Sequence, residues 1–265
     1  MERLQTRGPE IGICNICGLT ERLTDDHVPP KGVPLVGQVY LDRLSEALGA
    51  QKPTRQARLF QRGVKYRSIC AKCNNERLGQ ALDPTLVQFC KDAKAAITER
   101  LYLPSDIRVQ QNKLFRSVIG HLLAHGLGTH KAGQFIERKT EYFLKLDQPF
   151  PEDLRLYYWV YPYKPQIVGR ALARKELIIG TDVVIFSLLK FFPIAWLCSI
   201  GDLEGPDAAQ VTRVDHLATP NIEDFAHLRI NPSYIPAAHW PEAPGGNSVV
   251  LHNRLGTIAI PRPPQ

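Results

Sequence analysis

The chain has 265 residues, of which 44% are hydrophobic, and it carries a formal net charge of +7. This length accommodates one large domain or two small ones, and the hydrophobic fraction supports a sizeable core. The 6 cysteines are not evenly spaced and the first residues lack an apolar signal core, which argues against a disulfide-stapled secreted protein and favours a reducing cytoplasm.

The positive charge is concentrated near the N-terminus, where residues 1–80 hold 13 Lys and Arg against 8 Asp and Glu. Such an excess suits a polyanionic partner such as DNA or RNA, and a solubilising surface is the alternative. The longest apolar run extends from Val183 to Ile200 and is interrupted by Lys190 and Pro193. Its β-branched and aromatic content favours two buried strands over a membrane span, so no membrane partner is expected.

The N-terminal region is organised around the first of two cysteine pairs. Residues 1–12 are expected to form a loose arm. Cys14 and Cys17 then form a tight knuckle, which leads into a strand that ends at Asp26 and His27. Two prolines follow this strand and force the chain into an extended geometry, so the strand is expected to stop there.

The second cysteine pair, Cys70 and Cys73, is reached through an insertion at about residues 33–62 and a predicted strand at residues 64–70. Leucines at helical spacing predict a short helix inside the insertion. Asn74 follows the last cysteine directly and is expected to cap the start of a helix. The predicted order is therefore strand, strand, helix.

The cysteine spacing predicts a structural metal. A CxxC sequence places two thiolates on one tight turn, within reach of a single ion, and two such pairs supply four sulfur ligands. One pair alone would be weak evidence, because redox motifs share it, but two pairs indicate a closed tetrahedral zinc site. The predicted zinc ligands are Cys14, Cys17, Cys70 and Cys73.

Three features of this region occur together: a CxxCG pair, an Asp-His dipeptide, and a CxxCN pair with Arg77 three residues after Asn74. Together they resemble the HNH endonucleases of the ββα-metal (His-Me finger) class. The closing Cys-Asn-Asn-Glu-Arg-Leu-Gly is particularly similar to the zinc-bearing phage endonuclease VII branch. The resemblance covers about residues 10–80, and the remaining chain is only vaguely similar to a C-terminal region of uncharacterised bacterial HNH proteins.

The resemblance implies hydrolysis of phosphodiester bonds in DNA, with restriction or phage defence as the setting. His27 would be the general base, a role that suits a neutral imidazole near pH 7. Asp26 and Asn74 would hold one catalytic divalent metal ion, Mg²⁺, Mn²⁺ or Ni²⁺, and Asn75 is the rival for the role of Asn74. Family members often carry a central Asn before the second pair, where this chain has Tyr-Arg-Ser at residues 66–68.

The module is expected to contact DNA through phosphates, which position a protein without reading sequence, so low sequence specificity is predicted. RNA stays open as a substrate, because the metal site acts on the phosphate and not on the sugar. Arg77 occupies the Lys/Arg position of the family pattern, and a solvated helix residue is its alternative interpretation. The candidate nucleic-acid-binding residues are Arg77, Lys31, Arg58, Arg62, Lys65 and Arg67.

Residues 83–265 are expected to form a C-terminal domain of unknown role, which is a candidate surface for a homodimer or a protein partner. Apolar stripes predict helices from Asp83 onwards and at about residues 110–124. Residues 134–200 are predicted to be mostly β-strands, with their aromatic side chains in the strand core. Residues 201–265 are rich in Pro and Gly and are expected to form a surface tail.

Three histidines, His121, His125 and His130, lie on or beside one predicted helix. The first two are four residues apart, as in a metal-binding pair, but no Glu completes an HExxH arrangement. They are therefore interpreted as helix-surface or packed side chains.

The predicted fold is α+β: a small zinc-stapled ββα-metal nuclease module at residues 1–82, followed by a mixed helix and antiparallel-sheet domain at residues 83–265. The alternative is a non-catalytic zinc ribbon that binds nucleic acid or protein. A pure zinc ribbon has no need of Asp26, His27 and Asn74, so their joint presence favours the enzyme.

Overall fold

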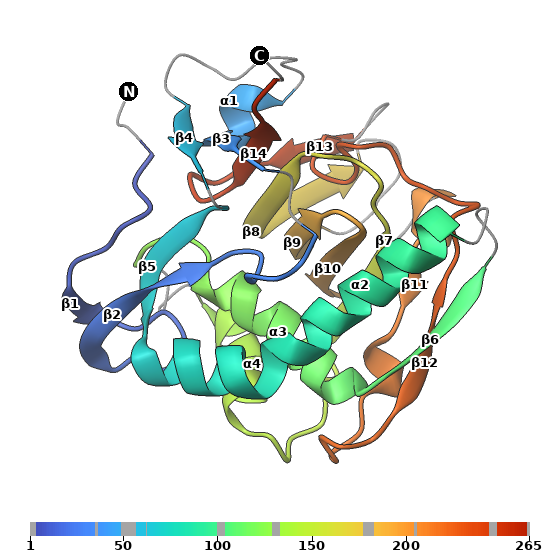
Figure 1. Ribbon diagram of the computed structural model, residues 1–265, viewed down its shortest axis with the longest axis horizontal. Helices are drawn as coiled ribbons and strands as arrows, with labels where there is room; N and C mark the ends of the chain where they lie inside the picture. Colours follow the sequence, from blue (N-terminus) through green and yellow to red (C-terminus); the bar gives the residue numbers. More distant parts are fainter. Residues whose placement is uncertain are drawn as a thin grey trace.

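The fold is α+β, with antiparallel sheets and few helices, which confirms the predicted class (Figure 1). No helix in the described part of the chain is long and apolar enough to cross a membrane. The computed structural model describes residues 4–34, 37–48, 57–61, 63–99, 104–128, 133–176, 183–203, 206–243 and 248–263.

A three-stranded sheet, in the order β1-β2-β5, carries both cysteine pairs at one of its ends. It consists of β1 (Ile11–Ile13), β2 (Thr20–His27) and β5 (Lys65–Cys70), and the predicted strands before each functional segment are confirmed. β2 and β5 are antiparallel, with a bulge that shifts their register between Thr24 and Asp25. A bulge bends a strand and re-aims its side chains, and this one lies directly before the Asp-His dipeptide.

The N-terminal arm is docked against this sheet, so the expectation of a loose arm is wrong for residues 6–8. The backbone N–H of Gly8 donates to the carbonyl oxygen of Arg67 at 3.0 Å, and the N–H of Arg67 donates to the oxygen of Thr6 at 2.9 Å. These bonds satisfy the open edge of β5, which would otherwise expose unpaired backbone groups.

A π-helix, η1 (Lys72–Leu82), follows β5 and continues without a break into α2 (Asp83–Glu99). The helix begins at Lys72, and Ala71 occupies the N-cap position without a side-chain cap. The prediction that Asn74 caps this helix is therefore wrong, because Asn74 lies inside the first turn. Two antiparallel strands and a helix nevertheless follow one another in the predicted order.

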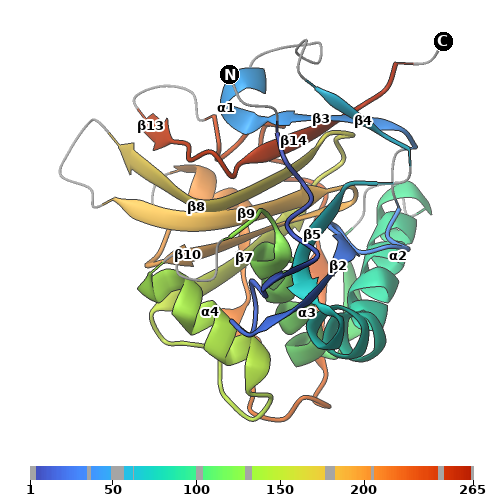
Figure 2. The same ribbon diagram turned by 90° about the vertical axis from the view of Figure 1, so that its left-hand side faces the viewer.

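Helix α3 (Gln111–Ala124) lies at the centre of the molecule, and its predicted position is confirmed. It contacts α2, η1 and α4, as well as β5 of the small sheet and β8 and β9 of the large one (Figure 2). All of its residues except Lys113 are buried, as expected for a helix enclosed on every side. The side chains of α3 are therefore enclosed between the small sheet and the large one.

Helix α4 (Gln134–Leu144) lies where mostly β-structure was predicted, and that prediction is wrong for this segment. Its buried residues are Phe135, Ile136, Lys139, Tyr142 and Phe143, which recur at helical spacing. Aromatic and β-branched residues favour strands only weakly, and the packing of one helical face against α3 decides the outcome here.

The nine-stranded sheet has the order β11-β7-β10-β9-β8-β14-β3-β4, with β13 also paired to β8. The two buried strands predicted in the longest apolar run are confirmed as β9 and β10. Its strands from the C-terminal region are β7 (Leu154–Val160), β8 (Gln166–Glu176), β9 (Val184–Phe191), β10 (Ile194–Ile200), β11 (Thr212–Arg213), β13 (Ser248–Leu251) and β14 (Thr257–Pro261).

The central strands β7, β9 and β10 of the large sheet are buried on both faces, and successive residues of each strand point to opposite sides. Tyr158 and Trp196 pack on the side of the helices, in the main core. Tyr157 and Trp159 pack on the opposite side, in a second core. The prediction that these aromatic side chains serve strand packing is confirmed by their burial.

The insertion contributes two strands to the large sheet. β3 (Val39–Arg43) pairs with β14, and β4 (Arg58–Phe60) pairs with β3. The short helix predicted here is α1 (Leu44–Ala47), although Leu41 of the same leucine series lies on the strand. The insertion therefore joins the N-terminal residues to the large sheet.

Residues 201–265 are more ordered than a surface tail, and the expectation is wrong for much of this segment. β12 (Ala226–Ile230) pairs with β6 (Ser105–Val109), and the remaining elements are η2 (Pro206–Gln210) and η3 (Asp215–Leu217). Lys190 of β9, which is fully buried, donates to both carboxylate oxygens of Glu242 at 2.7 and 3.0 Å. Buried charges need such pairing, so this contact anchors the segment to the sheet.

Candidate active site

The four predicted zinc ligands lie together at one end of the small sheet. The sulfur atoms of Cys14, Cys17, Cys70 and Cys73 lie within 4.8 Å of one another, and those of Cys17 and Cys70 are 3.8 Å apart. A zinc–sulfur distance of about 2.3 Å requires sulfur separations of about 3.8 Å in a tetrahedron. The cluster therefore fits a structural zinc ion, as predicted.

Local backbone geometry explains why the first pair forms a knuckle. Gly18 has a φ of +73°, in the left-handed region that favours glycine, and its N–H donates to the carbonyl oxygen of Cys14 at 3.0 Å. The N–H of Cys70 donates to the sulfur of Cys14 at 3.3 Å. A hydrogen bond from Cys73, with further backbone donors, lowers the pKa of Cys14 to about 4 despite burial, so one thiolate is already favoured.

The knuckle is also docked onto the central helix. The side-chain amide of Asn15 donates to the carbonyl oxygen of Gly126 at 2.9 Å, and the hydroxyl of Ser68 donates to that of Ala124 at 2.5 Å. These bonds satisfy carbonyl groups at the C-terminal end of α3, which have no partner inside the helix. The cysteine cluster thus fixes the small sheet against α3.

Asp26 points into the protein, and its position depends on the β2–β5 pairing. It lies opposite Tyr66 of β5 and is only 5% exposed. Its Oδ2 lies 3.6 Å from Nδ1 of His121 on α3. His121 is fully buried, and its Nε2 lies 3.0 Å from Oδ1 of Asp83, at the start of α2. One imidazole therefore bridges two carboxylates.

The charge of this bridge follows from its surroundings. Burial by itself lowers the pKa of His121, but the carboxylates of Asp83 and Asp26 outweigh burial and raise that pKa to about 10. Burial also raises the pKa of Asp26, and the neighbouring His121 counteracts part of that rise. The imidazole and the carboxylate of Asp26 therefore favour each other's charged forms.

Asn74 reaches from η1 back to β2. Its Nδ2 donates to Oγ1 of Thr24 at 2.9 Å and to the carbonyl oxygen of Asp25 at 3.3 Å. Because the amide nitrogen donates both hydrogen bonds, the amide oxygen points away from these two acceptors. The oxygen is the atom of an amide that a hard cation binds. The neighbouring Asn75 is exposed.

An open cleft of about 480 Å³ brings the predicted site residues together. Asp26, His27 and Asn74 all line it, together with Asn75, the rival of Asn74. Asp83, which the sequence analysis did not select, lines it as well. Its wall is rich in carboxylate and amide oxygens, which are the donors that Mg²⁺ and Mn²⁺ prefer. Carboxylate and amide side chains are therefore the main polar lining of the cleft.

The predicted basic residues are dispersed. Lys31 lines the cleft, and Lys65 lies opposite His27 in the β2–β5 pairing, where partners project to the same face. Arg67 lies 3.6 Å from Asp25, which also pairs with Arg7 at 3.0 Å.

Of the described basic candidates, Lys31 alone is among the residues that line the cleft. Arg77 lies on η1 and is partly exposed. Arg58 lies on β4, with its guanidinium 3.5 Å from the hydroxyl of Thr6 and 5.1 Å from the centre of the Phe60 ring. Arg62, and likewise the third histidine, His130, lie outside the described residues.

No motif of the sequence singled out Asp83. His121 is packed, as one of the two interpretations held, but it packs against two carboxylates of the cleft. His125 is the contrasting case, because its Nε2 lies 3.0 Å from Oγ1 of Thr257 and burial lowers its pKa to about 3. The buried stripe on α3 contains an unusual number of polar residues. This composition is the one feature of the sequence that could have indicated a role for His121.

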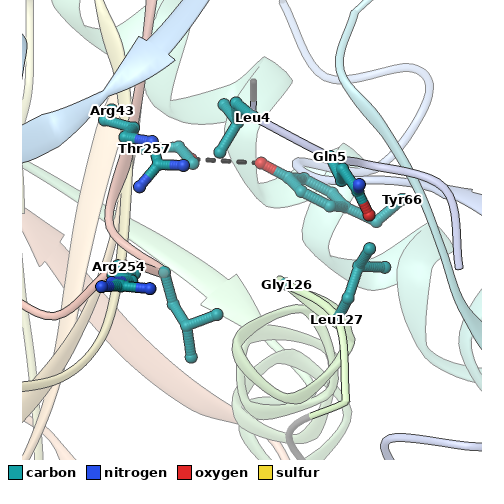
Figure 3. Close-up of a pocket in the computed structure, with 9 residues that line it drawn as sticks. Leu4, Gln5, Arg43, Tyr66, Gly126, Leu127, Arg254 and Thr257 are labelled. Carbon is teal, nitrogen blue, oxygen red and sulfur yellow. Dashed lines mark hydrogen bonds between the residues drawn. The ribbon is translucent and has the colours of Figure 1, made fainter. Parts of the chain in front are cut away.

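A second pocket, of about 200 Å³, shares no residue with the cleft. Figure 3 shows the guanidinium groups of Arg43 and Arg254 on one side of it and the ring of Tyr66 on the other. The hydroxyl of Tyr66 is hydrogen-bonded to Thr257 at 3.1 Å. Neither cysteine nor carboxylate lines this pocket, so it does not fit a metal site.

Comparison with known proteins adds no assignment. No family model matches the chain, and neither the curated proteins nor the solved structures contain a significant match.

Proposed function

We propose that this chain is a metal-dependent endonuclease of the HNH, ββα-metal class that hydrolyses phosphodiester bonds in DNA. The observation that carries the proposal is the cleft that is lined by Asp26 and His27 of β2 and by Asn74 of the helix that follows β5. A zinc ribbon without catalysis would not need these three side chains beside one opening.

The side chains of the cleft fit one divalent cation, Mg²⁺, Mn²⁺ or Ni²⁺. Asp26 and the amide oxygen of Asn74 would hold it, and hydrogen bonds to Thr24 and Asp25 keep that amide in place. When bound, such a cation acts as a Lewis acid that stabilises negative charge on the scissile phosphate and on the leaving 3′-oxygen.

The proposed roles of the remaining residues follow from their places. His27 accepts a proton from the attacking water, since a neutral imidazole is the most suitable base near pH 7. Lys31, on the rim of the cleft, binds a neighbouring phosphate and positions the strand. The resemblance to HNH proteins suggests restriction or phage defence as the biological setting.

Cleavage of supercoiled plasmid DNA tests the proposal. The zinc-loaded protein is expected to convert the plasmid to nicked and linear forms after addition of Mg²⁺, Mn²⁺ or Ni²⁺, and not without added metal. Parallel reactions with single-stranded DNA and with RNA identify the substrate. If a folded protein with one zinc per chain cleaves none of them in any of the three metals, the non-catalytic zinc ribbon becomes the better explanation.

Binding of the DNA backbone gives a second prediction. Replacing both Lys31 and Lys65 by Ala is expected to weaken binding to all short duplexes about equally, because phosphate contacts carry no sequence information. Each lost contact should also reduce the slope of log K against log salt by about one unit. Fluorescence titrations of labelled duplexes at several salt concentrations measure both quantities.

Arg229→Ala is the matched control for charge, because Arg229 is exposed on β12, in a different sheet, and does not line the cleft. It should leave the affinity and the salt slope close to those of the wild type. A double variant that binds like the wild type would place the DNA path elsewhere on the molecule.

A further inference from the structure

His121 connects the proposed metal ligand Asp26 to the centre of the molecule. Its Nδ1 lies 3.6 Å from Oδ2 of Asp26, which is within ion-pair distance but too long for a hydrogen bond, and neither of these two atoms has a hydrogen-bond partner in the described part of the chain. Its Nε2 lies 3.0 Å from Oδ1 of Asp83. The three residues come from three elements: β2, the start of α2, and α3. The imidazole is fully buried, and the side chains of Asp26 and Asp83 are 6% and 15% exposed.

The far side of this bridge is anchored a second time. The hydroxyl of Ser117 donates to Oδ1 of Asp83 at 2.7 Å. Ser117 precedes His121 by one turn of α3, so both side chains lie on the same face of that helix. Two donors on one rigid helix therefore hold a single oxygen of Asp83, and the imidazole is fixed in turn.

Burying ionisable side chains reduces the free energy of unfolding, so this arrangement is unfavourable if its role is only structural. Three ionisable side chains share one buried place, and an apolar cluster of similar volume would be at least as stable. Both carboxylates nevertheless line the cleft that contains Asn74 and His27. A group that fixes the orientation of a ligating carboxylate raises metal affinity, because the ligand loses less freedom on binding.

We infer that His121 is a positioning residue, which holds the carboxylate of Asp26 in the orientation that binds the divalent metal, with Ser117 and Asp83 as its anchor. The inference rests on the proposed function, since it takes Asp26 as a metal ligand. It also gives α3, which lies outside the region that resembles HNH enzymes, a part in the site.

Metal affinity, measured without any cleavage, tests this inference. The zinc-loaded protein is titrated with Mn²⁺, and bound metal is followed by the loss of the electron paramagnetic resonance signal of free Mn²⁺. His121→Asn is expected to raise the Kd for Mn²⁺ by about 10–100-fold, the usual effect of losing a partner of a metal ligand. Ser117→Ala, which removes only the anchor, should raise the same Kd by a smaller factor.

His125→Asn is the matched control. His125 follows α3 by one residue, is fully buried like His121, and bonds Thr257 instead of a carboxylate. It should lower the melting temperature to a similar degree but leave the Kd for Mn²⁺ unchanged. All titrations are made well below the melting temperatures of the variants, so that a loss of affinity does not report unfolding.

Asp26→Ala separates the two proposals. If Asp26→Ala abolishes Mn²⁺ binding while His121→Asn and Ser117→Ala bind like the wild type, the positioning role is overturned and the proposed metal ligand stands. If Asp26→Ala binds Mn²⁺ as tightly as the wild type, both the ligand and the positioning role are overturned. Should His121→Asn fail to fold, Ser117→Ala still decides the result.

Discussion

Replacing Cys70 by Ser is expected to reduce zinc content and folding stability together. Zinc binding contributes about 10–16 kcal/mol to the folding of small zinc-finger peptides, whereas a whole domain is stable by only about 5–15 kcal/mol. Three sulfur ligands remain in the variant, so part of this energy is kept, but a loss of several kcal/mol is expected. Elemental analysis and thermal unfolding of the same preparations measure both effects.

The position of the cysteine cluster explains why the loss of folding stability should extend beyond the zinc site. The knuckle of the first pair contacts α3 through Asn15, and β5 contacts it through Ser68. Without the metal, four crowded sulfur atoms lose the cation that offsets their charge, and both contacts weaken. We therefore expect loosening of the small sheet and of the cleft beside it, and not of the cysteine pairs alone.

Cys90→Ser provides the control for this experiment. Cys90 is fully buried on α2 and is not among the clustered cysteines. Its replacement buries a hydroxyl group in an apolar site, which costs about 1–3 kcal/mol, but should leave the zinc content at one per chain. A wild-type protein that contains no zinc when purified without chelator would contradict the assignment.

His27→Ala is expected to reduce the rate of DNA cleavage by about 10²–10⁴-fold, which is the usual contribution of a general base. The variant should keep its fold and its zinc, because His27 lies on the rim of the cleft and the cysteine cluster lies at the other end of β2. Rates of plasmid nicking under single-turnover conditions, with zinc content and circular dichroism of the same samples, measure the effect.

His227→Ala is the matched control for this variant. His227 is exposed on β12, in a different sheet, and does not line the cleft. It should cleave at the wild-type rate. If His27→Ala nicks plasmid as fast as the wild type, His27 is not the base, and another group of the cleft must activate the water.

Several elements could be predicted because their signals are local. Two cysteines three positions apart and a glycine with positive φ define one turn of the chain. The five residues 14–18 are therefore enough to predict the first knuckle. The strand β5 and the buried strands β9 and β10 follow from runs of apolar and β-branched residues. For such segments the preferred local structure and the packed structure agree.

Other elements could not be predicted because packing overrides weak local preferences. Residues 134–144 contain aromatic and β-branched residues that suit a strand, yet one face of α4 is buried against α3. Residues 257–261 follow a segment rich in Pro and Gly, yet β14 pairs with both β3 and β8 in the large sheet. Strand pairing of this kind depends on partners distant in the chain.

The residues of the cleft also divide into those that local sequence predicts and those that distant contacts bring together. Residues within a few positions of one another indicate which cysteines form each tight pair and which segment carries Asp26 and His27. The place of His121 between Asp26 and Asp83 comes instead from the packing of α3, because His121 and Asp83 are 38 positions apart in the chain. No local pattern encodes that contact, because it forms only when the small sheet, α2 and α3 pack around one core, where every buried charge must find a partner.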